Sequence, residues 1–385
     1  MLRHPEYLLR LIPSLRLLRR AHTRPNRRRY PSRDGEYDDE MVRKRERDHG
    51  GNLYFYKSIG QHILTNPRVL DAIVRKSHIR PTDTVLEIGP GTGNLTLKLL
   101  EAAKKVVAIE IDERMVEVLQ RRVTEFGFED KLSVIRKDAL RTEFPPFDLV
   151  VANIPYGISS PLVVKLFYGE NPFRSATLLL QKEFARRLLA KPGDSEFNRL
   201  AVNVKLVAEV DFIMDVSKRD FLPCPKVDSS VVIIRPKAEV PNVDLNEWSA
   251  FTRSCFSKKN KTLGATFKQK KKVMELFRLS NMTGLSKEIA ANYSNTNSCN
   301  TEDEESENEG KGHSSSCLEE GMSSFREKII GVLQSDRFEE KRPSKLSIEE
   351  LLHLLSLFNQ SGIFFHDHAK PKSAGNSAFA AACNS

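Results

Sequence analysis

Four consecutive residues, Asn153-Ile154-Pro155-Tyr156, could hold a flat substrate that carries an amino group. They follow the segment Asp148-Leu149-Val150-Val151-Ala152, which predicts a β-strand, and open α/β sheets bind ligands where strands end. The Asn153 side-chain oxygen can accept one hydrogen of the amine, and the Ile154 carbonyl can accept the other. Pro155 has no N–H and restricts Ile154 to an extended conformation, which points this carbonyl outward. Two such acceptors would turn the amine out of conjugation with its ring, so the motif indicates alkylation of an exocyclic nitrogen.

Two aromatic residues could enclose the ring of such a substrate. Tyr156 offers one face for stacking, which is worth about 1–3 kcal/mol per base in nucleic-acid complexes. Phe221 opens the segment 221–229, Phe-Leu-Pro-Cys-Pro-Lys-Val-Asp-Ser, and could cover the second face. The alternatives are that Phe221 is a core aromatic residue and that Asn153–Tyr156 is an ordinary proline turn.

A glycine-rich loop lies upstream of this motif. The run Glu87-Ile88-Gly89-Pro90-Gly91-Thr92-Gly93 ends another predicted strand, and glycines allow a tight turn and a close approach of the backbone to a ligand. The next strand ends at Glu110, whose carboxylate could accept hydrogen bonds from ribose hydroxyls. Asp138 follows the strand after that and could meet an adenine amino group. The pattern is typical of a site for a nucleoside-carrying cofactor.

Three cofactors compete for this loop. A phosphate-binding Walker loop requires Gly-Lys-Ser/Thr, but Asn94 follows Gly93. A nicotinamide dinucleotide site requires GxGxxG, whereas the spacing here is GxGxG. Glu87 begins an E-x-G-x-G-x-G pattern that favours S-adenosyl-L-methionine (SAM). A merely structural turn is the alternative, and the acids at the two following strand ends argue against it. The residues expected to bind SAM are Gly89, Gly91, Gly93, Glu110 and Asp138.

The composition limits the class of protein. The chain has 385 residues, enough for about two domains and tails, and 39% of them are hydrophobic, which suits a globular protein with some disorder. No apolar run reaches the ~18 residues of a membrane-spanning helix, so no membrane partner is expected. None of the five cysteines forms a CxxC pair, so neither a zinc site nor a redox dithiol is expected.

Positive charge is concentrated at the N-terminus. The net charge is +10, and residues 1–33 contain ten arginines, no lysine and one acid, Glu6. This composition is typical of a transit peptide, and the scarcity of serine favours the mitochondrion over the plastid. The alternatives are a basic tail that binds nucleic acid and a nuclear or nucleolar address.

The rest of the chain divides by composition. We predict a linker at 34–52, an α/β domain at 53–240, a helical domain at 241–368 and a loose tail at 369–385. Residues 294–317 are rich in Ser, Asn and Glu and nearly lack apolar residues, so we expect a disordered acidic insert there.

Alternation of short β-branched runs with helical patterns predicts a largely parallel sheet. The predicted strands are Thr84–Ile88, Val106–Ile111, Leu132–Arg136, Leu149–Ala152, Ala176–Leu180, Val207–Met214 and Ser229–Ile234. The last two are joined without a clear helix, which predicts an antiparallel pair at one edge. Helices are predicted at Trp248–Phe256, Lys270–Leu279, Ser323–Leu333 and Ser347–Leu357. Ser347 and Glu350 have the spacing of a capping box.

These motifs follow one another along the chain as they do in a known family. The chain resembles the KsgA-type family of ribosomal RNA adenine N6,N6-dimethyltransferases, especially its eukaryotic branch. The resemblance runs from about residue 58 to 263 and rests on Gly60–Leu64, Glu87–Gly93, Asn153–Tyr156, Gln181–Glu183, Phe221–Ser229 and Asn260–Leu263. It implies a class I SAM-dependent methyltransferase fold, with a Rossmann-like seven-stranded sheet, plus a small helical C-terminal domain. It also implies dimethylation of two adjacent adenines in a 3′-terminal hairpin loop of small-subunit ribosomal RNA. On this resemblance, His62 and Leu64 of an N-terminal arm would line the SAM site together with Asn153.

The resemblance also implies partners. The substrate would be ribosomal RNA within an immature small subunit, bound by a monomer. Basic side chains would contact phosphates, which gives affinity rather than sequence choice; the candidates are Arg186, Arg187, Arg199, Lys258, Lys259 and Lys261. The arginine-rich leader is foreign to the family core and indicates an organellar member. Two other functions fit parts of the pattern: a mitochondrial transcription-factor-like binding protein, and an enzyme that methylates DNA adenine or a protein glutamine amide.

Overall fold

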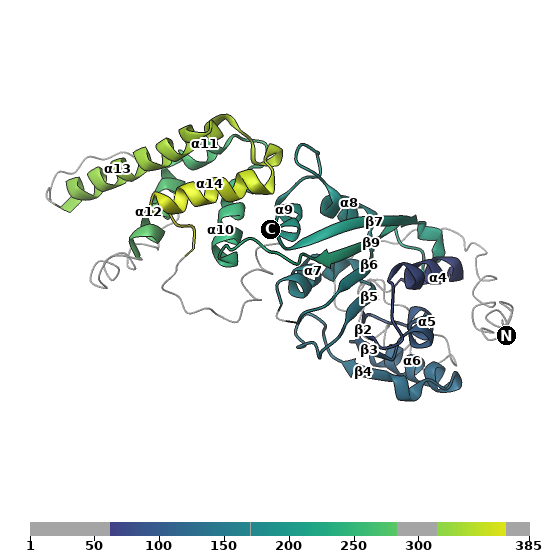
Figure 1. The fold of residues 1–385 in the computed structure, drawn as a ribbon. Coiled ribbons are helices and arrows are strands. Elements are labelled where there is room, and N and C mark those ends of the chain that lie inside the picture. Colours follow the sequence, from purple (N-terminus) through teal and green to yellow (C-terminus); the bar gives the residue numbers. More distant parts are fainter. Residues whose placement is uncertain (1–61, 170, 283–313, 367–385) are drawn as a thin grey trace, which may run out of the picture. The chain divides into compact units, whose positions relative to one another are not determined.

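A seven-stranded mixed β-sheet forms the centre of this computed structural model. The structure describes residues 62–169, 171–282 and 314–366, all of which belong to one compact unit. The strand order is β4-β3-β2-β5-β6-β9-β7 (Figure 1). In chain order the strands are β2 (Thr84–Ile88), β3 (Lys105–Glu110), β4 (Leu132–Arg136), β5 (Leu149–Asn153), β6 (Ser175–Gln181), β7 (Ala208–Val216) and β9 (Ser229–Pro236).

The predicted strands are confirmed, with small shifts at their ends. Strands β2 to β6 run parallel to one another, and β9 runs antiparallel to both β6 and β7. The antiparallel pair therefore lies at one edge of the sheet, as predicted. One boundary differs in an informative way: β3 ends at Glu110, and Ile111 is outside the strand and 62% exposed.

Helices cover both faces of the sheet, which explains why its strands are apolar on both sides. Val85 of β2 belongs to one buried cluster and its neighbour Leu86 to the other, because successive side chains point to opposite faces. One cluster includes residues of α4 (Pro67–Lys76), α5 (Asn94–Ala102) and α6 (Glu113–Glu125). The other includes residues of α7 (Ser159–Phe167), α8 (Lys182–Leu189) and α9 (Arg199–Val207).

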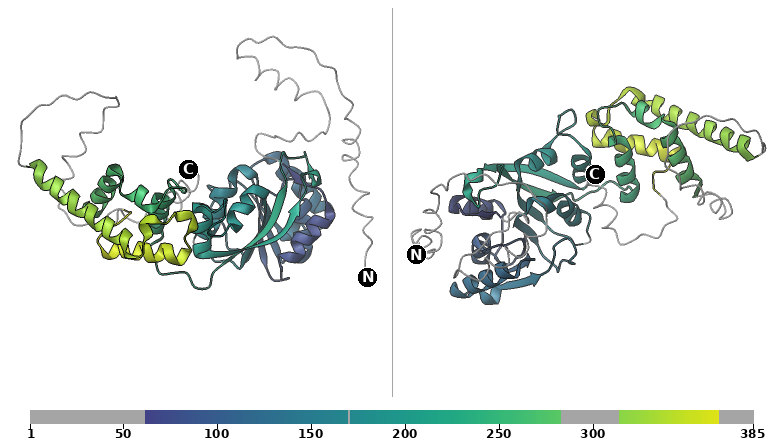
Figure 2. Two further views of the ribbon diagram at one scale, coloured as in Figure 1. Left: turned by 90° about the horizontal axis from the view of Figure 1, so that it is seen from above. Right: turned by 180° about the vertical axis from the view of Figure 1, so that it is seen from behind.

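Five further helices pack on one another in the C-terminal part (Figure 2). They are α10 (Leu245–Phe256), α11 (Leu263–Phe267), α12 (Lys270–Met282), α13 (Ser314–Ser335) and α14 (Ile348–Gln360). Their core contains edge-to-face aromatic pairs, such as Phe251 and Phe365 with ring centroids 5.1 Å apart. The buried Glu247 carboxylate accepts hydrogen bonds from the Phe365 and His366 amides, at 2.8 and 2.7 Å, which fixes the segment after α14.

Three short elements were not predicted. Strand β1 (Ile63–Leu64) pairs antiparallel with β8 (Phe221–Leu222) in a separate two-stranded sheet, and α11 spans only five residues. Elements this short give no periodic pattern in the sequence.

One prediction was wrong at its boundary. The acidic insert was expected to extend to residue 317, but α13 begins at Ser314; residues 294–313 lie outside the described part of the chain. The leader at 1–33, the linker at 34–52 and the tail at 369–385 also lie outside it. The division into domains near 240 stays a prediction, because one buried cluster continues from the sheet into the C-terminal helices. Among the described residues, no helix is both long and apolar enough to span a membrane.

The capping box at the start of α14 is confirmed. Ser347 Oγ accepts a hydrogen bond from the Glu350 amide at 3.1 Å, and the Glu350 carboxylate accepts one from the Ser347 amide at 2.9 Å. We expect Ser347→Ala to lower the free energy of unfolding by about 1 kcal/mol, the usual cost of losing an N-cap side chain. Chemical denaturation would measure it. Ser356→Ala, at an exposed position of the same helix, is the control and should be neutral or slightly stabilising; equal effects of the two substitutions would contradict the capping role.

Candidate active site

The two motifs meet where β2 and β5 lie side by side. The strands pair in parallel register, with Val85 opposite Leu149, so their carboxyl ends emerge at the same edge of the sheet. The chain continues from β2 to β3 on one side and from β5 to β6 on the other, and such a switch of direction is where open α/β sheets bind ligands. Gly89 has φ +68°, and a Cβ there would lie 3.3 Å from Pro155 Cδ. Glycine therefore allows the loop to contact the Asn153–Tyr156 motif.

The glycine loop is held by bonds to its backbone. Gly91 and Gly93 also have positive φ, at +55° and +86°, a conformation that favours glycine. A Cβ at Gly93 would lie only 2.6 Å from Leu119 Cδ1. The Arg122 guanidinium donates to the Thr92 carbonyl and, at 2.9 Å, to Asn94 Oδ1. Leu119 and Arg122, both on α6, therefore hold the glycine loop in place.

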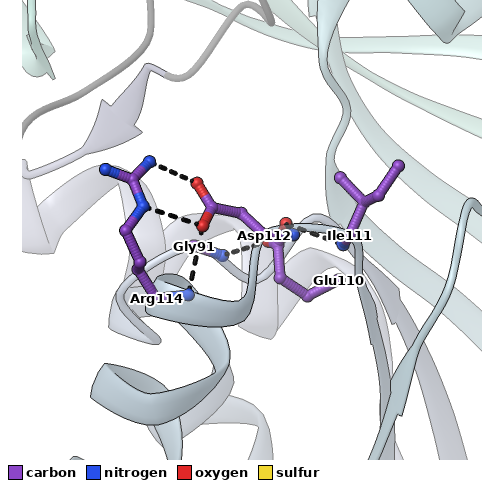
Figure 3. A network of polar contacts seen from close by, with 5 residues as sticks. All are labelled: Gly91, Glu110, Ile111, Asp112 and Arg114. Atoms are coloured by element: carbon purple, nitrogen blue, oxygen red, sulfur yellow. Dashed lines mark hydrogen bonds and ion pairs between the residues drawn. The ribbon is translucent and has the colours of Figure 1, made fainter. Parts of the chain in front are cut away.

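Glu110 joins this loop to the end of β3 (Figure 3). Its Oε1 accepts hydrogen bonds from the amides of Ile111 and Asp112, at 2.9 and 3.0 Å, while Oε2 lies 3.3 Å from the Gly91 amide. Burial raises the pKa of Glu110, and these backbone amides oppose the rise. Oε2 has only this long contact among the described residues, so it can accept a further hydrogen bond. The exposed Ile111 beside it is an apolar surface that our sequence reasoning missed.

Asp138 lies at the next strand end, after β4. Its Oδ1 accepts a hydrogen bond from the Leu140 amide at 2.9 Å, and its Oδ2 is 3.7 Å from Arg141 Nε. The side chain is 36% exposed. One oxygen therefore shapes the turn, and the other can accept a hydrogen from a ligand amino group.

Asn153 is tied to the N-terminal arm by the nitrogen of its amide. Asn153 Nδ2 donates to the His62 carbonyl at 2.9 Å, which leaves Oδ1 without a hydrogen-bond partner among the described residues. The arm is fixed at a second point, because Asn94 Nδ2 donates to the Leu64 carbonyl at 2.9 Å. His62 Nδ1 lies 2.8 Å from the Pro223 carbonyl; a carbonyl can only accept, so Nδ1 carries the hydrogen. The arm thus bridges the cofactor loop and the substrate motif.

The residues after Asn153 have distinct surroundings. Ile154 is 1% exposed, and its amide donates to the Leu179 carbonyl at 3.2 Å, which extends the strand pairing by one bond. Tyr156 is half-buried, and its hydroxyl lies 2.7 Å from Ser229 Oγ. Burial raises the pKa of Tyr156, and its ring centroid is 5.8 Å from that of His62. The phenol ring is therefore held in one orientation from both ends.

Phe221 does not have the expected surroundings. Its side chain is 3% exposed and packs within the buried cluster that includes Leu64, with which it pairs across β1 and β8. The interpretation of Phe221 as a core aromatic residue fits this position, and we drop its assignment to the second face of the substrate. The segment 221–229 contributes to the site by another route, since it supplies the Pro223 carbonyl and the Ser229 hydroxyl.

Glu87 is a second feature that sequence reasoning did not identify as part of the site. It is 1% exposed, and its Oε2 and the neighbouring Thr96 Oγ1 have no hydrogen-bond partner among the described residues. Burial raises the pKa of Glu87 to about 8, and the nearby Glu110 adds to the rise. With its pKa raised to about 8, this carboxyl group holds its proton at neutral pH, so it adds no negative charge to the site. The two strand-end acids carry the fit to SAM: Glu110 and Asp138 each keep an oxygen that can accept from a ribose hydroxyl or an adenine amine.

The raised pKa of Glu87 predicts a pH-dependent stability. The folded protein holds this proton up to about pH 8, whereas an ordinary glutamate loses it near 4.5, so unfolding between these values releases a proton. The free energy of unfolding should fall as pH rises through this window, by at most about 1.4 kcal/mol per pH unit from this group. Glu87→Gln removes this contribution, so the variant should become progressively more stable than the parent protein as pH rises.

Thermal unfolding measured from about pH 5 to about pH 8.5 tests this prediction. Glu110 is present in both proteins, so the difference between their curves reports Glu87 together with its coupling to Glu110. Glu117→Gln, at an exposed position of α6, is the control and should follow the parent curve. Parallel curves for the parent protein and Glu87→Gln would show that Glu87 is ionised in the folded state.

Sequence comparison relates the chain to one group of RNA-modifying enzymes. A family model described as ribosomal RNA adenine dimethylase matches residues 52–306. A mitochondrial ribosomal RNA small subunit methyltransferase of Arabidopsis thaliana is 62% identical over 347 residues, which cover 90% of this chain and 89% of the relative. A probable dimethyladenosine transferase of Drosophila melanogaster is 42% identical over 82% of this chain and 94% of the relative.

Structural comparison agrees. The crystal structure of a dimethyladenosine transferase from Plasmodium falciparum matches with a TM-score of 0.65 and 38% identity, over 79% of this chain and 100% of that chain. The predicted class I methyltransferase fold is confirmed by this match and by the strand order of the sheet. The family resemblance inferred from the motifs is confirmed as well. The chain belongs to the ribosomal RNA adenine dimethylase family of methyltransferases.

Proposed function

We propose that this chain transfers two methyl groups from SAM to the N6 amine of each of two adjacent adenines in small-subunit ribosomal RNA. One observation carries the proposal. At the carboxyl end of β5, Asn153 is anchored through its amide nitrogen to the His62 carbonyl at 2.9 Å, which directs its unpartnered Oδ1 away from the arm. An acceptor in this position, beside a glycine loop that suits SAM, is what methylation of an exocyclic amine requires.

The chemical roles follow from hydrogen bonding. Asn153 Oδ1 and the Ile154 carbonyl would each accept one N6 hydrogen, which rotates the amine out of conjugation and exposes its lone pair. Neither group has to remove a proton before the reaction, because the nitrogen becomes acidic once it is methylated. Tyr156, whose hydroxyl is held by Ser229, would stack on the adenine. SAM, when bound, supplies an electrophilic methyl group.

The cofactor would be held from four directions. Glu110 Oε2 would accept from the ribose hydroxyls, and Asp138 Oδ2 would accept from the adenine amine. The loop residues Gly89, Gly91 and Gly93 would allow the close approach of SAM to the backbone, and His62 and Leu64 would border the site through the arm.

Ribosomal RNA contacts would come from a subset of the expected cations. Lys259 Nζ donates to the Ser195 carbonyl at 2.9 Å, and Arg187 pairs with Glu183, so these side chains have structural roles in the described fold. Among the described residues, Lys258 and Lys261 are exposed and form no hydrogen bond or ion pair through their side chains, so they are better placed to meet phosphates. Arg186 is also exposed, but it interacts electrostatically with Asp215. The partner would be an immature small ribosomal subunit, bound by a monomer.

The mitochondrion is the proposed compartment. Two observations support it: the ten arginines and single acid of residues 1–33, and the mitochondrial designation of the Arabidopsis thaliana relative. Imaging of a fusion that carries a C-terminal fluorescent tag, with and without residues 1–33, would test the address.

The reaction itself is tested with the full chain, labelled SAM and immature small ribosomal subunits, followed by nucleoside analysis. Label in N6,N6-dimethyladenosine of the small-subunit RNA supports the proposal. Label in DNA or in a protein glutamine instead would move the substrate assignment to those amines. No transfer despite SAM binding would favour a binding role of the mitochondrial transcription-factor type.

Asn153→Ala tests the central acceptor. We expect methyl transfer to fall by two orders of magnitude or more, roughly the loss seen when a preorganised hydrogen-bonding group is removed from an active site, because the amine would keep its conjugation. SAM binding, measured by isothermal titration calorimetry, should persist. Asn171→Ala is the matched control: its half-buried amide also donates to a backbone carbonyl, that of Phe144 at 3.0 Å, and its transfer rate should be unchanged. Full activity of Asn153→Ala would overturn the mechanism.

A further inference from the structure

The turn after β4 offers two sets of hydrogen-bond acceptors: the oxygens of Asp138 and the backbone carbonyls of the residues that follow it. The Asp138 carbonyl accepts hydrogen bonds from the amides of Arg141 and Thr142, both at 3.0 Å, and from Thr142 Oγ1 at 2.7 Å. Together with the bond from the Leu140 amide to Asp138 Oδ1, these contacts close the turn and leave Asp138 Oδ2 on one side. The carbonyls of the following residues are left for another donor.

That donor is a single lysine on α7. Lys165 Nζ donates to the Ala139 carbonyl at 2.7 Å, to the Leu140 carbonyl at 3.1 Å and to the Thr142 carbonyl. An ammonium group has three hydrogens, so all of its donors are used within this one turn. The same nitrogen lies 4.2 Å from the centroid of the Phe144 ring, within the range of a cation–π interaction.

The environment of Lys165 is unusual for a lysine. The side chain is half-buried, and burial lowers the pKa of its ammonium group while the charges of Asp138 and Glu143 oppose this effect. A half-buried ammonium group with three carbonyl acceptors is rigid, unlike a solvated surface lysine. Its positive charge also lies near the carboxylate of Asp138.

Helix α7 connects this contact to the substrate motif. The helix begins at Ser159, directly after the turn Tyr156–Ile158, and Ser159 Oγ lies 3.4 Å from the Pro155 carbonyl. Lys165 is on the same helix, six residues on from Ser159, or about 9 Å along the axis. Helix α7 therefore begins just after the Asn153–Tyr156 motif and carries, near its own end, the lysine that holds the Asp138 turn.

We infer that Lys165 is a positioning residue that sets the adenine-binding turn of the cofactor site relative to Asn153–Tyr156. This inference rests on the proposed function, because it takes Asp138 as the adenine acceptor. Without the ammonium group, three carbonyls lose their donor and the turn can shift. A misplacement of about 1 Å between reacting groups can cost up to about 100-fold in rate, so the anchor matters for catalysis although it touches neither ligand.

The test compares three variants of the full chain, Lys165→Met, Lys165→Arg and Lys205→Met. Lys205→Met is the matched control, because the half-buried Lys205 also donates to backbone carbonyls, those of Leu189 and Ala190 at the end of α8. Binding of SAM and of 5′-methylthioadenosine, which keeps the adenine and ribose but lacks the amino-acid part, is measured by isothermal titration calorimetry. The kcat and the KM for SAM are measured with immature small subunits, at temperatures below the unfolding transition of every variant.

We expect Lys165→Met to weaken binding of both ligands, because the shifted turn no longer presents Asp138 to the adenine. It should also lower kcat by up to about 100-fold, because the methyl group and the target amine are no longer aligned. Lys165→Arg should recover part of the affinity, and Lys205→Met should bind both ligands as the parent protein does. Parent-like binding by Lys165→Met, or weakened SAM with unchanged 5′-methylthioadenosine, would overturn the inference and leave the proposed function intact. Failure of the parent protein to bind SAM would overturn both.

Discussion

The parallel pairing of β2 with β5 is the constraint on which the whole site depends. Their register brings two strand ends to one level, and the chain leaves those ends in opposite directions across the sheet. The glycine loop and Asn153 therefore become neighbours although they are far apart in sequence. The absence of a side chain at Gly89 allows the loop to lie against Pro155. The other residues of the site either hold the glycine loop and Asn153 in place or continue the row of polar strand ends along the same edge of the sheet.

Polar side chains hold the junction mainly by bonding to backbone carbonyls. Arg122 donates to the glycine loop, Asn94 and Asn153 donate to the arm, and Lys165 donates to the Asp138 turn. Each of these bonds fixes the path of a loop, which a bond between two flexible side chains would do less well. The acids proposed to bind the cofactor, Glu110 and Asp138, therefore each keep an oxygen available for a ligand. One set of side chains therefore positions the loops, and another set keeps acceptors available for a ligand.

Much of this could be read from the sequence. The seven strands, their antiparallel edge and the acids at successive strand ends follow from local patterns, because β-branched runs and strand-end positions are set by nearby residues. The position of Phe221 could not be read in this way. Whether an aromatic side chain faces a ligand or the core depends on β1, a strand of two residues whose partner lies more than 150 positions away. Lys165 was equally hidden, since nothing in a helical segment shows which distant carbonyls its lysine will meet. The sequence shows Glu87 only as the first residue of the E-x-G-x-G-x-G motif. Its burial and its unpartnered Oε2 follow only from the structure.

The N-terminal arm is held largely through its main chain. The carbonyls of His62 and Leu64 accept from Asn153 and Asn94, and the amide of Thr65 donates to the Asp220 carbonyl. Two side chains add to these bonds: the His62 ring bonds to the Pro223 carbonyl, and Thr65 Oγ1 donates to the Asp220 carbonyl at 2.9 Å. Main-chain hydrogen bonds do not depend on which side chains the arm carries. Only the side chains that fill the core or form bonds of their own restrict its sequence. The path of the arm is therefore set largely by atoms that every residue carries, and a substitution at an arm position that is neither buried nor bonded through its side chain should leave that path unchanged.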